Sequence, residues 1–160
     1  MAIYLEFAGI KGNVTAEGFK DQIALLSCNF GVSRGISMEP GNLSNREATR
    51  PSLSEISISK EADTSVIALF KESVTGDAGK TVKIRFVRTG ADKVQEYMIY
   101  ELENCLVSSY SMSANGDDAP IENLTLSYSK LMITYKDTDE KLGVGSQQVA
   151  GYSLTDGKPV

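Results

Sequence analysis

The sequence predicts a mainly β, antiparallel fold with a single short helix. Apolar and polar residues alternate along most of the chain, which is the pattern of half-buried antiparallel strands. Only one segment has helical spacing. The 160 residues contain 41% hydrophobic and 23% charged residues, a globular rather than a disordered composition. We therefore expect one domain over residues 1–160.

The expected strands can be assigned in order from the N-terminus. The first spans residues 2–7, and the next lies within residues 21–34. There, Ser27 and Asn29 should occupy one face of the strand. The opposite face should carry Leu26, Cys28, Phe30 and Val32. Further strands are expected over residues 53–60, 81–87 and 123–130, and a short last one near 149–154. An unusually long strand is expected over residues 101–113, and a loop over residues 136–148.

The helix is predicted over about residues 63–74, with Asp63 or Thr64 as its N-cap and Gly76 soon after its end. It is too short to be stable alone, so it should pack against a sheet or close one end of a barrel. The residues expected on its apolar side are Val66, Ile67, Leu69 and Phe70.

Charge and motif content argue against several function classes. The net charge of −5, with scattered basic residues, disfavours nucleic acid and anionic membranes as partners. The chain has no histidine, which removes the commonest general base and metal ligand. The segment "GDAGKT" (76–81) lacks the first glycine of a phosphate loop, because position 74 is valine. We expect no enzyme activity, no catalytic residue, no cofactor and no metal.

The two cysteines, Cys28 and Cys105, lie in strand-like apolar patterns and are interpreted as small buried hydrophobic residues. A disulfide between them would require neighbouring strands, which the sequence alone does not establish. The N-terminus has no basic leader, no sustained apolar stretch and no cleavage site, so export through a cleaved signal peptide is not expected.

Several segments resemble the haemolysin-coregulated protein (Hcp) family, the tube proteins of type VI secretion systems. Residues 95–135, "QEYMIYELENCLVSSYSMSANGDDAPIENLTLSYSKLMITY", contain an aromatic-rich strand, an "LVSS" strand, a polar turn and a strand ending in tyrosine. Residues 50–73 resemble the family's strand, lysine, aspartate and helix. The start, "IYLEFAGIKGNV", fits as well. Val66 departs from a proline that is frequent in the family's helix.

This resemblance implies a small antiparallel β-barrel of two sheets with one flanking helix, assembling into a homohexameric ring. Rings would stack into a tube that a contracting sheath expels together with spike proteins. Effector proteins would be held and stabilised in the pore. The protein would reside in the bacterial cytoplasm before firing and then be secreted without a cleaved signal.

The resemblance also suggests site residues. Ser27 and Asn29 would line the pore, and Asn29 corresponds to a cargo-contact position. The face of Ser109, Ser111 and Ser113 is a further candidate, although residues of both groups are also what ordinary solvent-facing strands would show. The irregular loop 35–51 is longer than most connections, and such loops tend to be functional. Its candidate residues for contacts between subunits or stacked rings are Arg34, Glu39, Arg46, Glu47 and Arg50.

Two other readings stay open at this point. A phage-like tail-tube protein would share the same architecture. A monomeric ligand-binding β-barrel would need an apolar cavity with a few convergent polar groups, but the chain has no tryptophan and no evident aromatic cluster.

Overall fold

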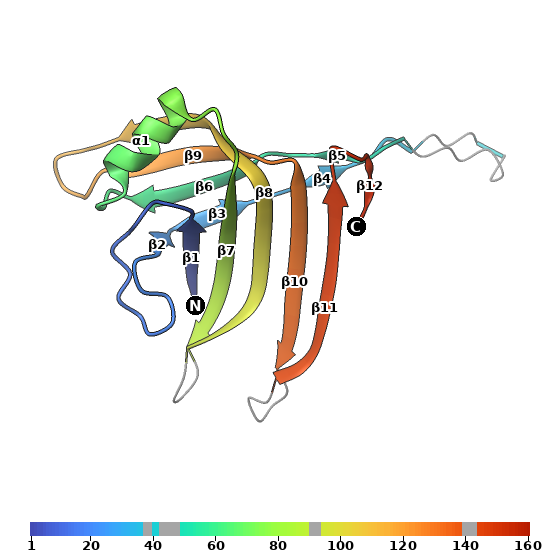
Figure 1. Ribbon diagram of the computed structural model, residues 1–160, viewed down its shortest axis with the longest axis horizontal. Helices are drawn as coiled ribbons and strands as arrows, with labels where there is room; N and C mark the ends of the chain where they lie inside the picture. Colours follow the sequence, from blue (N-terminus) through green and yellow to red (C-terminus); the bar gives the residue numbers. More distant parts are fainter. Residues whose placement is uncertain (37–39, 42–48, 90–93, 139–143) are drawn as a thin grey trace.

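The computed structural model describes residues 1–36, 40–41, 49–89, 94–138 and 144–160 (Figure 1). Within them the fold is mainly β with one helix, as the sequence predicts. None of the described helical residues forms a helix long and apolar enough to cross a membrane. The elements are β1 (Ala2–Phe7), β2 (Ile23–Leu25), β3 (Ser27–Asn29), β4 (Val32–Ser33), β5 (Ser52–Leu53), β6 (Ile56–Glu61), α1 (Val66–Thr75), β7 (Lys80–Thr89), β8 (Val94–Ser113), β9 (Ile121–Ser127), β10 (Lys130–Thr138), β11 (Val144–Ser153) and β12 (Lys158–Pro159).

The strands form two antiparallel layers that cross at a steep angle in Figure 1. Sheet A has the order β12-β11-β10-β8-β7-β1-β2, and sheet B has the order β3-β6-β9-β8. A separate hairpin of β4 and β5 extends beyond sheet B. Because β8 belongs to both sheets and β2 leads directly into β3, the layers join at two corners and close a barrel.

The length of β8 follows from this closure. Its first half pairs with β7 and β10 in sheet A, and the half from Leu106 to Ser113 pairs with β9 in sheet B. The strand turns between the sheets at Asn104, which has a φ of 50°. Gly79 lies against this corner, where an added Cβ would come within 2.5 Å of the Asn104 Cα. The corner therefore needs a residue that tolerates left-handed geometry and a neighbour without a side chain.

The second corner lies between β2 and β3. β2 pairs with β1 in sheet A, whereas β3 pairs with β6 in sheet B. The chain changes layers at Leu26, whose backbone N–H donates to the Ser59 carbonyl at 2.7 Å. One strand was expected within residues 21–34. The chain instead leaves sheet A there and forms three short strands, β2, β3 and β4. Of the expected apolar face, Cys28 and Phe30 contact the core, whereas Leu26 and Val32 are exposed.

The core lies between the sheets and confirms most of the predicted alternation. The central apolar residues of the two layers are fully buried, Leu5 and Ile84 in sheet A and Ile56 and Leu126 in sheet B among them. The helix adds Leu69, which is 0% exposed. Apolar side chains from both sheets and the helix therefore pack into one core.

The helix begins later than predicted and turns part of its apolar side outward. Ser65, not Asp63 or Thr64, is the N-cap, and the Asp63 carboxylate accepts the Ser65 backbone N–H at 2.8 Å in the turn before it. Ile67 and Phe70, expected to face the sheet, are 75% and 52% exposed. With about 3.6 residues per turn, a helix that points Leu69 inward places Ile67 on the opposite side. Phe70 lies on the flank of the helix, where its ring meets the Tyr110 ring of β8.

The C-terminal region contains more strand than predicted. Residues 136–138 belong to β10, residues 144–148 belong to β11, and the intervening residues 139–143 lie outside the described residues. Apolar alternation is missing here because residues 146–150 are exposed in this part of the sheet. Likewise, the expected strand 123–130 ends at Ser127, and Lys130 already begins β10.

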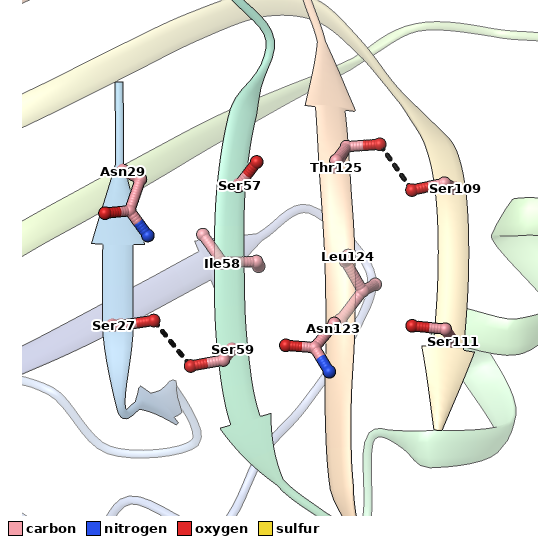
Figure 2. A pocket seen from close by; sticks show the side chains of 10 residues that line it. All are labelled: Ser27, Asn29, Ser57, Ile58, Ser59, Ser109, Ser111, Asn123, Leu124 and Thr125. Carbon is pink, nitrogen blue, oxygen red and sulfur yellow. Dashed lines mark hydrogen bonds between the residues drawn. The ribbon is translucent and has the colours of Figure 1, made fainter. Parts of the chain in front are cut away.

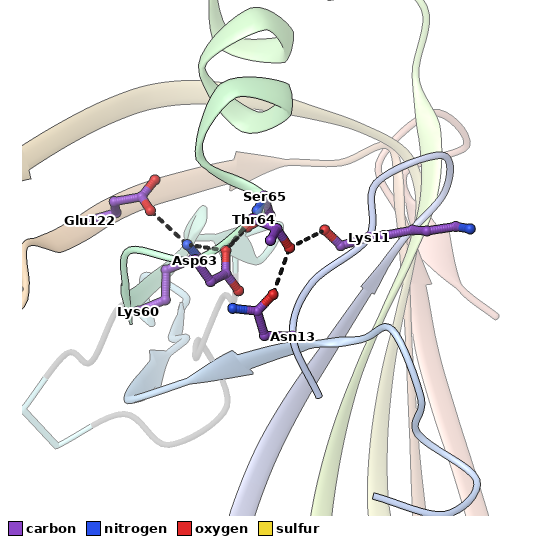
Figure 3. A network of polar contacts seen from close by, with 7 residues as sticks. All are labelled: Lys11, Asn13, Lys60, Asp63, Thr64, Ser65 and Glu122. Carbon is purple, nitrogen blue, oxygen red and sulfur yellow. Dashed lines mark hydrogen bonds and ion pairs between the residues drawn. The ribbon is translucent and has the colours of Figure 1, made fainter. Parts of the chain in front are cut away.

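A buried ion pair joins sheet B to the helix (Figure 3). The Lys60 Nζ lies 2.6 Å from the Glu122 Oε1, and both side chains are 0% exposed. The same ammonium lies 3.1 Å from the Asp63 Oδ1, in the turn that leads into α1. The ends of β6 and β9 and the start of the helix are therefore held by one buried charge and its two partners.

We expect Asn104→Val to unfold more easily than Asn104→Gly by about 1–2 kcal/mol, since a β-branched residue is disfavoured at positive φ. Both variants lose the hydrogen bond from the Asn104 amide to the Ser129 hydroxyl (3.0 Å), so their difference isolates the backbone effect. Urea denaturation at fixed protein concentration measures it. Equal stability would mean that this residue does not shape the corner.

Lys60→Met should destabilise the protein by about 3–5 kcal/mol, because it leaves the Glu122 carboxylate buried and unpaired. The double variant Lys60→Met/Glu122→Leu should recover most of this loss, since it removes both charges and keeps the site filled. Thermal and urea unfolding of the two variants test this. A double variant as unstable as the single one would contradict an electrostatic origin.

Candidate functional site

The outer face of sheet B carries a continuous set of short polar side chains. Strand register places Ser27 opposite Ser59 and Asn29 opposite Ser57. The same rows continue across β9 onto β8. Because paired residues of neighbouring strands point to the same side, all of these side chains share one surface. We call this surface the serine face: Ser27, Asn29, Ser57, Ser59, Ser109, Ser111, Asn123 and Thr125 (Figure 2).

Hydroxyl groups on the serine face bind one another across the strands. The Ser27 and Ser59 hydroxyl oxygens lie 2.5 Å apart, and the Ser109 and Thr125 hydroxyl oxygens lie 2.6 Å apart. Ser108, beside the bulge in β8, donates to the Glu55 carboxylate at 2.7 Å. Several polar groups of the face therefore already have hydrogen-bond partners within the protein. They gain less free energy from hydrogen bonds to another molecule than unpaired groups would.

The serine face is shallow and uncharged. It lines an open hollow of about 280 Å³, to which Ile58 and Leu124 also contribute. Glu55 and Glu61 continue the same side of β6 beyond the two ends of the face, so carboxylates lie at its borders. None of the eight residues is ionisable, and the chain has no histidine that could activate a hydroxyl.

The described residues also contain no group of three or more metal-ligating side chains that could hold an ion. The face therefore offers hydrogen bonding and a wettable surface and lacks the groups that acid–base or metal chemistry needs.

The structure brings together residues that are far apart in the sequence. Ser27 and Asn29 lie on the same surface as Ser109 and Ser111. Ser113 lies further along β8 and lines a different hollow beside the turn that follows. Sequence reasoning did not assign Ser57, Ser59, Asn123 and Thr125 to this site. Their alternation with buried residues was visible, but the strand order that joins them was not.

The proposed contact loop is described only at its base. Arg34 and Arg50 are exposed there, whereas Glu39, Arg46 and Glu47 lie outside the described residues. The two sides of the base are joined by the Thr49 hydroxyl, which accepts the Gly35 N–H at 2.9 Å, and by the Thr49 N–H, which donates to the Gly35 carbonyl at 2.9 Å.

Both cysteines are free thiols that contact the core. Cys105 is 1% exposed and Cys28 is half-buried. Burial raises the pKa of Cys28 to about 11 and the pKa of Cys105 to about 12. Both thiols are therefore protonated and poorly nucleophilic near neutral pH, as expected for small hydrophobic residues.

Comparison with known proteins identifies relatives. A sequence profile of the family described as "Type VI secretion system effector, Hcp" matches residues 4–135. Among solved structures, a type six secretion system protein superposes with a TM-score of 0.91 at 23% identity and covers 99% of each chain. Hcp1 from Salmonella typhimurium gives 0.78 at 23% identity, covering 99% of this chain and 98% of its own. A type VI secretion system effector from Yersinia pestis gives 0.75 at 16% identity, covering 94% and 98%. The search of curated proteins gave no match.

We expect Cys28 in the folded protein to react with iodoacetamide at pH 8 roughly a hundredfold more slowly than a thiol with the ordinary pKa near 8.5. The rate should rise with pH toward the raised pKa, because only the thiolate reacts. Mass spectrometry of alkylated peptides measures this, with the urea-unfolded protein as the control. An ordinary rate in the folded protein would contradict it.

Proposed function

We propose that this chain, which belongs to the Hcp family of type VI secretion proteins, assembles into six-membered rings whose pore is lined by the serine face. The Hcp family consists of secreted, structural components of the secretion system, which supports a structural role for this chain. We further propose that these rings stack into a tube and hold effector proteins in the pore.

The serine face is the observation that carries this proposal. A pore that passes varied proteins should be polar, nearly uncharged and free of sticky apolar patches. The eight residues of the serine face are polar and uncharged, and several of their hydroxyl groups already bind one another. We propose that effector proteins contact this face, with Ser27 and Asn29 among the contact residues. Short, neutral side chains would allow such contacts without selecting one charge pattern.

The opposite side of the barrel suits a different partner. On the side of sheet A away from the core, the Arg85 guanidinium lies 2.6 Å from the Glu6 carboxylate and 3.2 Å from the Glu96 carboxylate. The Lys136 ammonium lies 2.9 Å from Glu96. If sheet B faces the pore, these ion pairs on sheet A lie on the outside of the ring. Charges of both signs at a surface favour specific, reversible contacts, which we assign to the surrounding sheath.

Stacking of rings is assigned to the contact loop. Arg34 and Arg50 stand exposed at its base, next to the β4–β5 hairpin that extends away from the barrel (Figure 1). A projecting, charged element can reach a neighbouring ring without disturbing the barrel core. Contacts of this kind weaken as salt screens them, so stacking should be sensitive to ionic strength.

The ring itself is tested by native mass spectrometry of the purified chain, with negative-stain images of the same sample. The proposal expects a species of six times the chain mass that appears as open rings. A monomer that persists at high protein concentration would refute the ring.

A large side chain on the serine face should block cargo without unfolding the protein. We expect Asn29→Trp, or Ser27→Trp, to keep the hexamer and its melting temperature but to lower the amount of co-purifying effector several-fold, because the indole narrows the proposed contact surface. Gln147→Trp is the matched control, since Gln147 is an exposed residue of β11 in sheet A. Unchanged effector levels in cells that carry Asn29→Trp would contradict the proposal that effectors contact the serine face.

A further inference from the structure

The turn between β8 and β9 contains the single Asn-Gly pair of the sequence, Asn115 and Gly116. Every residue from 113 to 119 is exposed, and the turn extends beyond the end of sheet B that lies opposite the β4–β5 hairpin (Figure 1). The other six asparagines all precede residues that have a side chain. Because glycine has no Cβ, its nitrogen can approach the side chain of a preceding asparagine with little hindrance.

The backbone of the same turn binds the Asn115 side chain. The Asn115 Oδ1 accepts the Asp117 N–H and the Asp118 N–H, each at 3.1 Å. Asparagine commonly bonds its own backbone two residues on in this way. Two N–H groups aimed at one carbonyl oxygen also stabilise the negative charge that forms there when a nucleophile attacks the carbonyl carbon. The turn therefore favours attack on the Asn115 Cγ.

The Gly116 nitrogen is available as that nucleophile. Among the described residues, none accepts a hydrogen bond from its N–H. Apart from its chain neighbours, no atom lies within 4 Å of the place where a Cβ on Gly116 would stand. The pair Asp156–Gly157 is the other place where glycine follows an acidic or amide side chain of this length. It differs because the Gly157 N–H donates to the Ser153 carbonyl at 2.8 Å, which holds its proton in place.

We propose that Asn115 is a site of self-modification, where the folded chain exchanges a side-chain amide for a carboxylate without an enzyme. The Gly116 nitrogen gives its proton to solvent and bonds to the Asn115 Cγ, while the bond from Cγ to Nδ2 breaks. Nδ2 takes up a proton and leaves as ammonia. Water then opens the cyclic imide at either carbonyl and gives aspartate or isoaspartate at this position. Nothing is oxidised or reduced, and the reaction needs one chain and no ring.

The product changes the charge and the backbone of the turn. A third carboxylate joins those of Asp117 and Asp118, and like charges this close repel one another. In isoaspartate, the carbonyl that accepted the two N–H groups becomes part of the main chain, so the turn must rearrange. Aged copies of the chain therefore differ from fresh copies at this end of sheet B.

Peptide mass spectrometry of the purified chain, sampled while it ages in mildly alkaline buffer, tests the site. Residue 115 should gain the mass of an amide-to-acid change before any other asparagine does, and faster as the pH rises, because the Gly116 nitrogen must lose its proton. Gly116→Ala is the matched variant: its Cβ meets open space, so it should keep the melting temperature and slow the change several-fold. An unmodified Asn115, or wild-type speed in Gly116→Ala, would overturn the proposal.

A synthetic peptide of residues 110–120 tests the part played by the folded turn. The peptide keeps the Asn-Gly pair but does not hold the two N–H groups on the Asn115 Oδ1, so the folded chain should convert several-fold faster. Equal or slower conversion in the folded chain would overturn the activation by the turn. The Asn115→Asp variant marks the position of the aspartate product on an isoelectric focusing gel. None of these outcomes bears on whether the chain forms rings, so the proposed function stands or falls separately.

Discussion

The passage of two strands from one sheet to the other is the constraint on which the rest of the structure depends. At Asn104 and at Leu26 the chain leaves sheet A and enters sheet B, and these corners close the barrel. Without these corners, sheet A would be an open layer, and β3, β6 and β9 would not be joined to it. The corners also set the register that gathers four strands' polar residues into the serine face. A local backbone requirement thus determines a surface formed by distant parts of the sequence.

The two sides of sheet B divide the chemistry of the protein. Inward-facing residues such as Ile58 and Leu124 join the core, whereas their neighbours along each strand carry hydroxyl or amide groups outward. Near the start of the helix the inward side changes character, because Lys60 and Glu122 form a buried ion pair there. Burying both charges is costly unless they are matched. This pair, together with Asp63, fixes the start of α1 against sheet B.

Much of the fold could be predicted from the sequence, and the failures have physical causes. Alternation identified β1, β6 and β7, because each has one side in the core. The long strand was expected from residue 101, whereas β8 already begins at Val94. Alternation failed for β11, which is exposed over residues 146–150, and for residues 21–34, where the chain changes layers. Ser27 and Asn29 were placed on a common face by period alone. Their grouping with Ser109 and Ser111 needed the strand order, which depends on tertiary pairing.

The burial of both thiols has a consequence for a protein that is exported. A secreted protein passes from a reducing to an oxidising compartment, where exposed cysteines of neighbouring molecules form disulfides. Here Cys105 lies in the core, and Cys28 points to the core side of β3 rather than to the serine face. In the proposed ring, the serine face would present no cysteine to oxidation, so the subunits would stay joined by noncovalent contacts alone. The proposed assembly would then come apart after delivery without a reductant.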